Sequence, residues 1–231
     1  MRSFRHDFEE FARLSSSQSR FQLAWADRSP CLTDRTPQTS FDAHYIYHCA
    51  WAARILSGIR PVYHVDLGSS LNFVTQVSAF IPMAFFDIRP PMIRLDGLNV
   101  GDANLTALPF PDGALPSVSC MHVIEHIGLG RYGDALDPCG DLKAIAELRR
   151  VVAPAGWLLF VVPVGRPRIA FNAHRIYAHH QVIEAFGGWP LEKYALVTDP
   201  GPATRLVADA SMELSDSQRY GCGCFLFRRP A

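Results

Sequence analysis

The sequence has no excess of charge of either sign and almost no lysine. Its 22 basic residues balance 22 acidic residues, and only Lys143 and Lys193 are lysine. A protein that binds a nucleic-acid backbone or an anionic membrane surface needs clustered positive charge. The composition therefore argues against nucleic acid and against a charged membrane as the main partner.

Long apolar segments are also absent. The longest run, WLLFVV at 157–162, is far shorter than the roughly 20 residues of a helix that spans a membrane. The first residues, MRSFRHDFEEF, alternate charge with phenylalanine, which is unlike a secretory signal. We therefore expect no membrane span and a cytoplasmic location.

Several motifs that carry chemistry are missing. The six cysteines form no C-x-x-C pair and no zinc-ribbon spacing, so they are interpreted as reduced thiols and no metal site is predicted. The sequence has no G-x-S-x-G elbow and no Gly-Lys dipeptide. Esterase and P-loop nucleotide hydrolase activities therefore have little support.

What is present is enough apolar sequence for one large domain. The chain has 231 residues, of which 48% are hydrophobic, so folding can bury a core without metal or disulfide links. Residues 1–60 are predicted to form an N-terminal helical arm, and 61–231 the main domain. In the arm, a helix near 4–14 and a Ser-, Pro- and Thr-rich connector at 15–39 precede a helix from Ser40 to Gly58. The apolar stripe expected to be buried on that second helix comprises Phe41, Tyr45, Cys49, Ala52 and Leu56.

From residue 61 short apolar runs alternate with helical segments, which is typical of a parallel sheet with crossover helices. We expect a helix at 141–152 with Leu142, Ile145, Leu148 and Val152 on its buried face. The prediction is an α/β fold with a Rossmann-like, seven-stranded, mostly parallel sheet whose last two strands form an antiparallel edge. The predicted strands lie near 62–67, 83–87, 98–100, 117–123, 157–162, 193–198 and 222–228.

Polar and glycine residues follow these strands, at the edge where such sheets bind ligands. The first strand leads into a turn with Asp66, Gly68, Ser69 and Ser70, whose free backbone N–H groups suit an anion. The second strand ends at Asp87, 21 residues after Asp66, a spacing typical of a ribose-binding acid. Later strands lead into GDANLTALPFPDG at 101–113 and CMHVIEHIGLGRYGD at 120–134.

In this order, these strings and the segment LRRVVAPAGWLLFVVPVG at 148–165 resemble the class I S-adenosylmethionine-dependent methyltransferases, in particular the methyltransferase type 11-like branch. The likeness covers about 61–190, and the strings look like an uncharacterised subfamily. The resemblance implies S-adenosylmethionine as cofactor. It places Asp66 and Gly68, with the turn residues Ser69 and Ser70, at the methionine moiety, Asp87 at the ribose, Asp102 and Ala103 at the adenine, and His122 facing the methyl donor.

The glycine motif departs from the family pattern, because Ser70 and Asn72 occupy the positions of its later glycines. Side chains there could crowd the cofactor or could hydrogen-bond its carboxylate. Two functions therefore stay open. One is methyl transfer to a small-molecule acceptor such as a hydroxylated metabolite or a sugar, and the other is a non-catalytic binding or assembly module.

The candidate catalytic bases are His126 and His174. The segment FNAHRIY at 171–177 follows the fifth strand, where the family often builds its acceptor pocket, so Asn172 and Arg175 are predicted to bind substrate, Arg175 as a clamp for an anion. Glu125, which with His126 matches the family's E-H pair, is placed with them. The sequence does not indicate an oligomeric state.

Two rival enzyme classes share parts of this pattern. His122, Glu125 and His126 spell H-x-x-E-H, the inverted zinc-peptidase motif, but that site needs both histidines on one helix, whereas Gly128 and Gly130 follow here at once. A nicotinamide dehydrogenase would share Asp87 but needs a G-x-G-x-x-G turn that the sequence does not supply.

Overall fold

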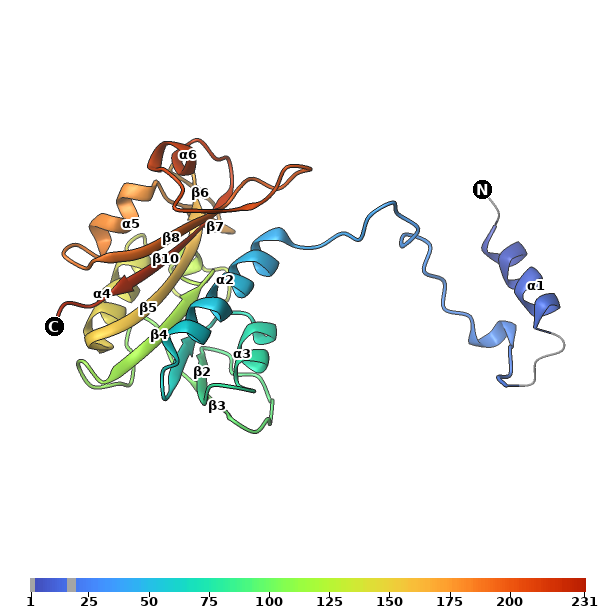
Figure 1. The fold of residues 1–231 in the computed structure, drawn as a ribbon, viewed down its shortest axis with the longest axis horizontal. Helices are drawn as coiled ribbons and strands as arrows, with labels where there is room; N and C mark the ends of the chain where they lie inside the picture. The colour runs from blue at the N-terminus through green and yellow to red at the C-terminus, as the bar shows by residue number, and fades with distance from the viewer. Residues whose placement is uncertain (1–2, 16–19) are drawn as a thin grey trace. The chain divides into compact units, whose positions relative to one another are not determined.

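A computed structural model describes residues 3–15 and 20–231 of the chain (Figure 1). The chain divides into two compact units, the first ending at Phe41 and the second beginning at Asp42. The sequence pattern suggested a boundary at residue 60 instead. The difference arises because the helix after Asp42 buries Trp51, Ala52 and Leu56 in the core of the second unit.

The first unit is built on one amphipathic helix, α1 (Phe4–Leu14), and a short 3-10 turn, η1 (Trp25–Asp27). Ser3 caps α1 by accepting a hydrogen bond from the backbone N–H of His6. Phe4 and Phe8 of α1 pack against the ring of Trp25, with ring centroids 5.9 and 4.9 Å apart. Residues 16–19 of the predicted connector lie outside the described residues.

The second unit contains an eight-stranded sheet with the order β3-β2-β1-β4-β5-β10-β8-β9. The first five strands in that order are mutually parallel, whereas β10 runs antiparallel to both β5 and β8, and β9 antiparallel to β8. The strands are β1 (His64–Leu67), β2 (Met83–Asp87), β3 (Leu98–Asp102), β4 (Leu115–Met121), β5 (Val152–Val164), β8 (Leu191–Val197), β9 (Leu206–Ala208) and β10 (Gly221–Arg228).

The sheet confirms the predicted α/β fold class and its mostly parallel order, but not the predicted strand count or edge. The eighth strand, β9, lies within the segment 199–221 that the sequence pattern left as a connector. β10 is an inner strand rather than an edge, and its residues from Gly221 to Phe227 are all buried. Its run of apolar residues suits this position because an inner strand is covered on both faces.

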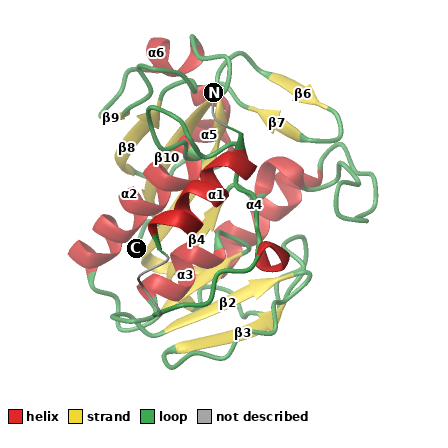
Figure 2. Cartoon of the chain, turned by 90° about the vertical axis from the view of Figure 1, so that its right-hand side faces the viewer, coloured by secondary structure: helices red, strands yellow, loops and turns green. Residues whose placement is uncertain are grey.

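Helices cover both faces of the sheet (Figures 1 and 2). The helices α2 (Ala43–Ile59) and α3 (Leu71–Val77) pack on one face, and α4 (Gly140–Val151) and α5 (His179–Ala185) on the other. A short helix, α6 (Met212–Asp216), precedes β10. Figure 2 shows β6 (Arg168–Ala170) and β7 (His174–Ile176) as a separate two-stranded ribbon. No helix in the described part of the chain has the length and apolar character of a membrane span.

The buried faces of two helices differ only in part from those predicted. In α4, Ile145 and Leu148 are buried as expected, and so is Val152, which begins β5, whereas Leu142 is 54% exposed. α2 starts from Asp42, whose side chain accepts a hydrogen bond from the N–H of Tyr45, and not from Ser40.

The buried side of α2 includes two histidines, His44 and His48. In contrast, Phe41 and Tyr45, which were expected in the apolar stripe, are 58% and 41% exposed. Polar side chains on this helix therefore face inward, where His44 and His48 lie against the ring of His122 in the loop after β4.

Candidate functional site

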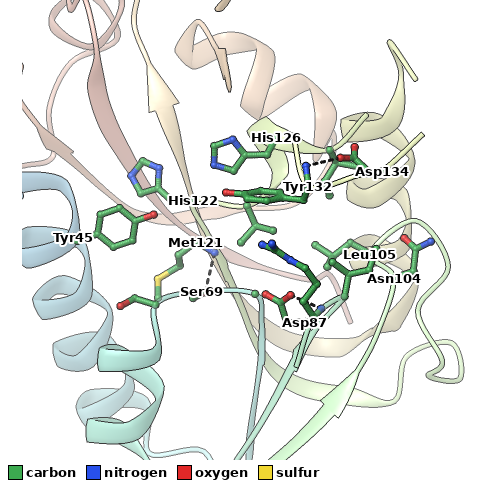
Figure 3. A pocket seen from close by; sticks show the side chains of 16 residues that line it. Tyr45, Ser69, Asp87, Asn104, Leu105, Met121, His122, His126, Tyr132 and Asp134 are labelled. Carbon is green, nitrogen blue, oxygen red and sulfur yellow. Dashed lines mark hydrogen bonds between the residues drawn. The ribbon is translucent and has the colours of Figure 1, made fainter. Parts of the chain in front are cut away.

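A pocket of the second unit lies at the carboxyl ends of β1, β2 and β4, the edge where doubly wound sheets bind ligands (Figure 3). Its volume of about 270 Å³ is near the lower end of the range for small-molecule sites. His122, His126 and Tyr132 face Ser69 and Asp87 across it. It is lined by Tyr45, Gly68, Ser69, Ser70, Asp87, Ile88, Arg89, Asn104, Leu105, Met121, His122, Val123, His126, Ile127, Tyr132 and Asp134.

Asp66 at the end of β1 shapes the turn below the pocket. Its side chain is fully buried, with one oxygen accepting a hydrogen bond from the N–H of Ser69 at 2.9 Å and the other from the hydroxyl of Ser119. Burial raises the pKa of Asp66 to about 6. Asp66 does not line the pocket, so its carboxylate orders the turn rather than reaching a ligand directly.

Gly68 allows the turn to pass close to the other pocket walls. It has a φ of 76°, and a Cβ there would lie 3.2 Å from Val123 Cγ1 and 3.6 Å from the carboxylate of Asp87. The hydroxyl of Ser69 accepts a hydrogen bond from the N–H of Met121 at 3.1 Å. The turn therefore presents backbone to the pocket.

The departures from the glycine motif leave this space open. Ser70 lines the pocket as the N-cap of α3, where its side chain makes no capping hydrogen bond. Asn72 is exposed and is not among the lining residues. The side chains of Ser70 and Asn72 therefore do not fill the pocket, and the turn leaves space for a ligand.

The end of β2 places Asp87 in the pocket wall. One carboxylate oxygen accepts a hydrogen bond from the N–H of Arg89 at 2.7 Å, which fixes the side chain at the strand end. From the next strand, Asp102 is exposed and Ala103 is buried, and neither lines the pocket. Asn104 and Leu105 line it in their place.

The register of the sheet explains why Asn104 and Leu105, and not Asp102 and Ala103, line the pocket. Asp102 is still part of β3, where it pairs with Asp87 in the register of the sheet. The backbone N–H of Ala103 also bonds the carbonyl of Asp87, at 3.2 Å. The chain reaches the pocket only after this last contact between β2 and β3. The sequence motif alone does not show at which residue the pairing of the two strands ends.

The loop after β4 brings His122 to the pocket in an unusual backbone conformation. His122 has a φ of 58°, in the left-handed region that side chains other than glycine seldom adopt and that is found preferentially at functional sites. Its Nδ1 lies 2.8 Å from a carboxylate oxygen of Glu125, in the 3-10 turn η2 (Ile124–His126). Burial lowers the pKa of His122 to about 4 and raises that of Glu125 to about 7.

Glu125 therefore contacts His122 and does not itself line the pocket. Its side chain is 1% exposed and is absent from the pocket wall, so its predicted contact with substrate is not found. His122 Nε2 and Glu125 Oε2 are both buried without a hydrogen-bond partner among the residues that the structure describes.

His126 lines the pocket, whereas the other predicted base does not. The Nδ1 of His126 donates to the carbonyl of Ala173 at 2.6 Å, and burial lowers its pKa below the ordinary value. His174 lies in β7 with its ring stacked on Tyr220, the centroids 4.7 Å apart. Asn172 is exposed and also lies outside the pocket wall.

Arg175 holds loops together instead of facing a ligand. It is 5% exposed, and its guanidinium donates to the carbonyl of Ile127 at 2.6 Å and to those of Asp137 and Pro138 at 3.3 Å. Its Nε lies 3.6 Å from a carboxylate oxygen of Asp141. The donors of Arg175, which the sequence analysis expected to clamp an anion, are directed at these groups, and the residue does not line the pocket.

The zinc-peptidase arrangement is also not formed by the H-x-x-E-H motif. His122 lies before η2 and His126 inside it, not one turn apart on an α-helix. The Nδ1 atoms of the two residues contact different groups, Glu125 and the carbonyl of Ala173.

Sequence reasoning missed the contribution of α2 to the site. Tyr45 lines the pocket, and its ring lies 5.5 Å from that of His122. The ring of His44 stacks on the same imidazole with the centroids 5.3 Å apart, and the ring of His48 lies tilted against it at 5.1 Å. Two histidines four residues apart on one helix face were the signal that could have revealed this.

Comparisons with known proteins agree with this architecture. Residues 113–196 match the family described as "Caenorhabditis protein of unknown function, DUF268", and that match covers the loop with His122 and Glu125. No curated protein is significantly similar to the chain.

Solved structures show the same fold at low sequence identity. The 1,6-didemethyltoxoflavin-N1-methyltransferase of Burkholderia thailandensis is 12% identical, with a TM-score of 0.58 over 80% of this chain and 79% of that one. NodS, an N-methyltransferase from Bradyrhizobium japonicum, is 15% identical, with a TM-score of 0.57 over 89% and 94%. The [4+2]-cyclase SpnF is 14% identical, with a TM-score of 0.51 over 78% and 81%. The chain has the fold of the class I S-adenosylmethionine-dependent methyltransferases.

Proposed function

We propose that the protein transfers a methyl group from S-adenosylmethionine to a small-molecule acceptor. The observation that carries this proposal is the pocket at the carboxyl ends of β1, β2 and β4, where Gly68 approaches Asp87 closely and leaves room for a ligand. Structural neighbours in which S-adenosylhomocysteine is bound support it.

The donor would lie between the β1 turn and the ends of β2 and β3. Backbone at Gly68 and Ser69 with the hydroxyl of Ser70 would hold the methionine part, and Asp87 would accept hydrogen bonds from the ribose hydroxyls. Asn104 and Leu105 replace Asp102 and Ala103 as the proposed adenine contacts. When bound, the donor supplies an electrophilic methyl group on a sulfonium.

The acceptor would lie on the opposite wall, beside Tyr45, His122, His126 and Tyr132. Methyl transfer depends mainly on holding two reactants in line and excluding water. A hydroxylated acceptor, such as a hydroxylated metabolite or a sugar, also needs a base for its proton. His126 suits that role because its lowered pKa leaves the ring neutral near pH 7, while the bond from Nδ1 to Ala173 leaves Nε2 as the basic atom.

The test is the affinity for S-adenosylhomocysteine, measured by calorimetry. Asp87→Ala should weaken binding about 10- to 100-fold, because hydrogen bonds to a charged group contribute about 1.5–3 kcal/mol. Asp102→Ala is the matched control, since this exposed carboxylate ends the adjacent strand outside the pocket wall. Equal affinities of wild type and Asp87→Ala would refute the donor site.

A second candidate is a module that keeps the fold without methyl transfer. Ser70 places a side chain where methyltransferases of this branch have glycine, and the similar protein SpnF is a [4+2]-cyclase. In that case the wild-type protein would show no binding of S-adenosylhomocysteine, while its thermal unfolding would remain cooperative.

A further inference from the structure

A second group of side chains with donor atoms lies behind the wall of the pocket. One donor atom from each of His44, His122 and Cys222 lies within 4.8 Å of the other two, and all three residues are buried. They come from α2, from the loop after β4 and from β10, three segments that are far apart in the sequence. This explains why no cysteine or histidine spacing in the sequence predicts the group.

One ring nitrogen of His122 has no hydrogen-bond partner among the residues that the structure describes. His122 is 7% exposed, and its Nε2 has no hydrogen-bond partner among the described residues, although its Nδ1 is engaged by Glu125. An unpaired buried polar atom costs free energy, so its presence in a closely packed cluster needs an explanation. A metal ion would supply the missing partner.

Both histidines are also oriented as metal-binding histidines are. A ligating imidazole usually donates its other ring N–H to a carboxylate or to a backbone carbonyl. His122 directs Nδ1 at the carboxylate of Glu125, 2.8 Å away, and His44 directs Nε2 at the carbonyl of Tyr220, 3.1 Å away. This leaves Nε2 of His122 and Nδ1 of His44 as the nitrogens available to an ion.

We propose that His44, His122 and Cys222 form a zinc-binding site beside the donor pocket. Two imidazoles and one thiolate are a donor set that Zn²⁺ favours, and three protein ligands leave a fourth tetrahedral position open. Ligands of a tetrahedral zinc ion lie about 3.5 Å apart, so small side-chain rotations close the site. The thiol proton of Cys222 is released to solvent as the zinc–sulfur bond forms.

The position of this site links it to the pocket. His122 lines the pocket and its ring is 5.5 Å from Tyr45, which lines it as well. An ion on His122 would therefore lie directly behind the pocket wall that this residue forms. Metal binding itself does not depend on methyl transfer, so the two proposals can fail separately.

The experiment measures Co²⁺ and Zn²⁺ binding to the full-length protein after treatment with a chelator, under conditions that keep thiols reduced. We expect one Co²⁺ per chain, with a thiolate-to-cobalt charge-transfer absorption that Zn²⁺ abolishes by displacement. Cys222→Ser should remove this absorption and weaken binding at least tenfold. Glu125→Gln should weaken binding about 10- to 100-fold through the orientation of His122.

Cys224→Ser is the matched control. Cys224 is buried on the same strand, and its sulfur is 4.0 Å from that of Cys222, but it is not part of the cluster. This variant should keep the absorption, as should Asp87→Ala, which concerns only the donor. His44→Gln provides a second ligand variant if Cys222→Ser does not fold. Absence of stoichiometric Co²⁺ in the wild type, or an unchanged absorption in both ligand variants, would overturn the proposal.

Discussion

Asp66 is an acidic side chain with no exposed surface at the base of the pocket turn, and its environment makes stability depend on pH. Desolvation raises its pKa from 3.8 to about 6, in spite of its hydrogen bonds with Ser69 and Ser119. Between these values the folded protein keeps the proton while the unfolded chain releases it. The contribution of Asp66 to stability therefore falls as the pH rises from about 4 to about 6.

Asp66→Asn removes this dependence. The free energy of unfolding of the variant, relative to wild type, should rise between pH 4 and pH 7 by up to about 3 kcal/mol, about 1.4 kcal/mol for each pKa unit. Urea unfolding at four pH values measures the difference, in which the effects of buried histidines common to both proteins cancel. Parallel stability curves over this range would contradict the raised pKa.

At the scale of single residues, the sequence identified side chains better than their roles. Gly68 follows β1 and Asp87 ends β2, two strands that the apolar runs of the sequence indicate, and both residues line the pocket. Asp66 and Glu125 follow strands too, but their burial depends on neighbours such as Ser119 and His122 that only the folded chain brings together.

The element that positions the β4 loop is the hairpin of β6 and β7, through Arg175. This arginine joins β7 to η2 and to the start of α4, by bonds to three backbone carbonyls and an ion pair with Asp141. Removal of the guanidinium would leave these groups buried and poorly paired. Such a loss costs more than an exposed ion pair does.

We expect Arg175→Gln to lower the free energy of unfolding by about 2–4 kcal/mol. Arg166→Gln, which changes an exposed arginine close by, should change it by less than about 0.5 kcal/mol. Guanidinium unfolding monitored by circular dichroism compares the two. Similar stabilities of both variants would show that Arg175 does not hold the loop.

At the scale of elements, strands were predicted more accurately than helix faces. β2 lies at the predicted residues, and β5 contains the predicted strand 157–162 but begins earlier, at Val152. The buried face of a helix depends on what it packs against. α2 directs His44 and His48 inward because the loop with His122 covers them, which hydrophobic spacing cannot reveal.

The molecule as a whole divides after Phe41, and all residues of the pocket and of the proposed metal site belong to the second unit. A chain of residues 40–231, which keeps the helix cap Asp42, should therefore fold. Its thermal midpoint should stay within about 4 °C of the full-length value, a difference of less than about 1 kcal/mol for a domain of this size. Differential scanning calorimetry measures it, and a noncooperative transition would contradict the division.

The overall architecture followed from the order of apolar runs, since alternation of strands and helices leaves few ways to build a parallel sheet. The strand order beyond β5 did not follow. β10 is apolar over most of its length, as an inner strand is, whereas β8 has the exposed Glu192 and Lys193 near its start, but the order of the two segments in the sequence does not show that the later one lies between β5 and the earlier one.

That inserted strand has a consequence for how the protein is made. During synthesis β8 and β9 leave the ribosome before β10, yet in the described sheet β10 lies between β5 and β8. Until residues 221–228 have been translated, neither β5 nor β8 can form its pairing with β10. Synthesis of β10 joins the two parts of the sheet and brings Cys222 to His122 in the same event.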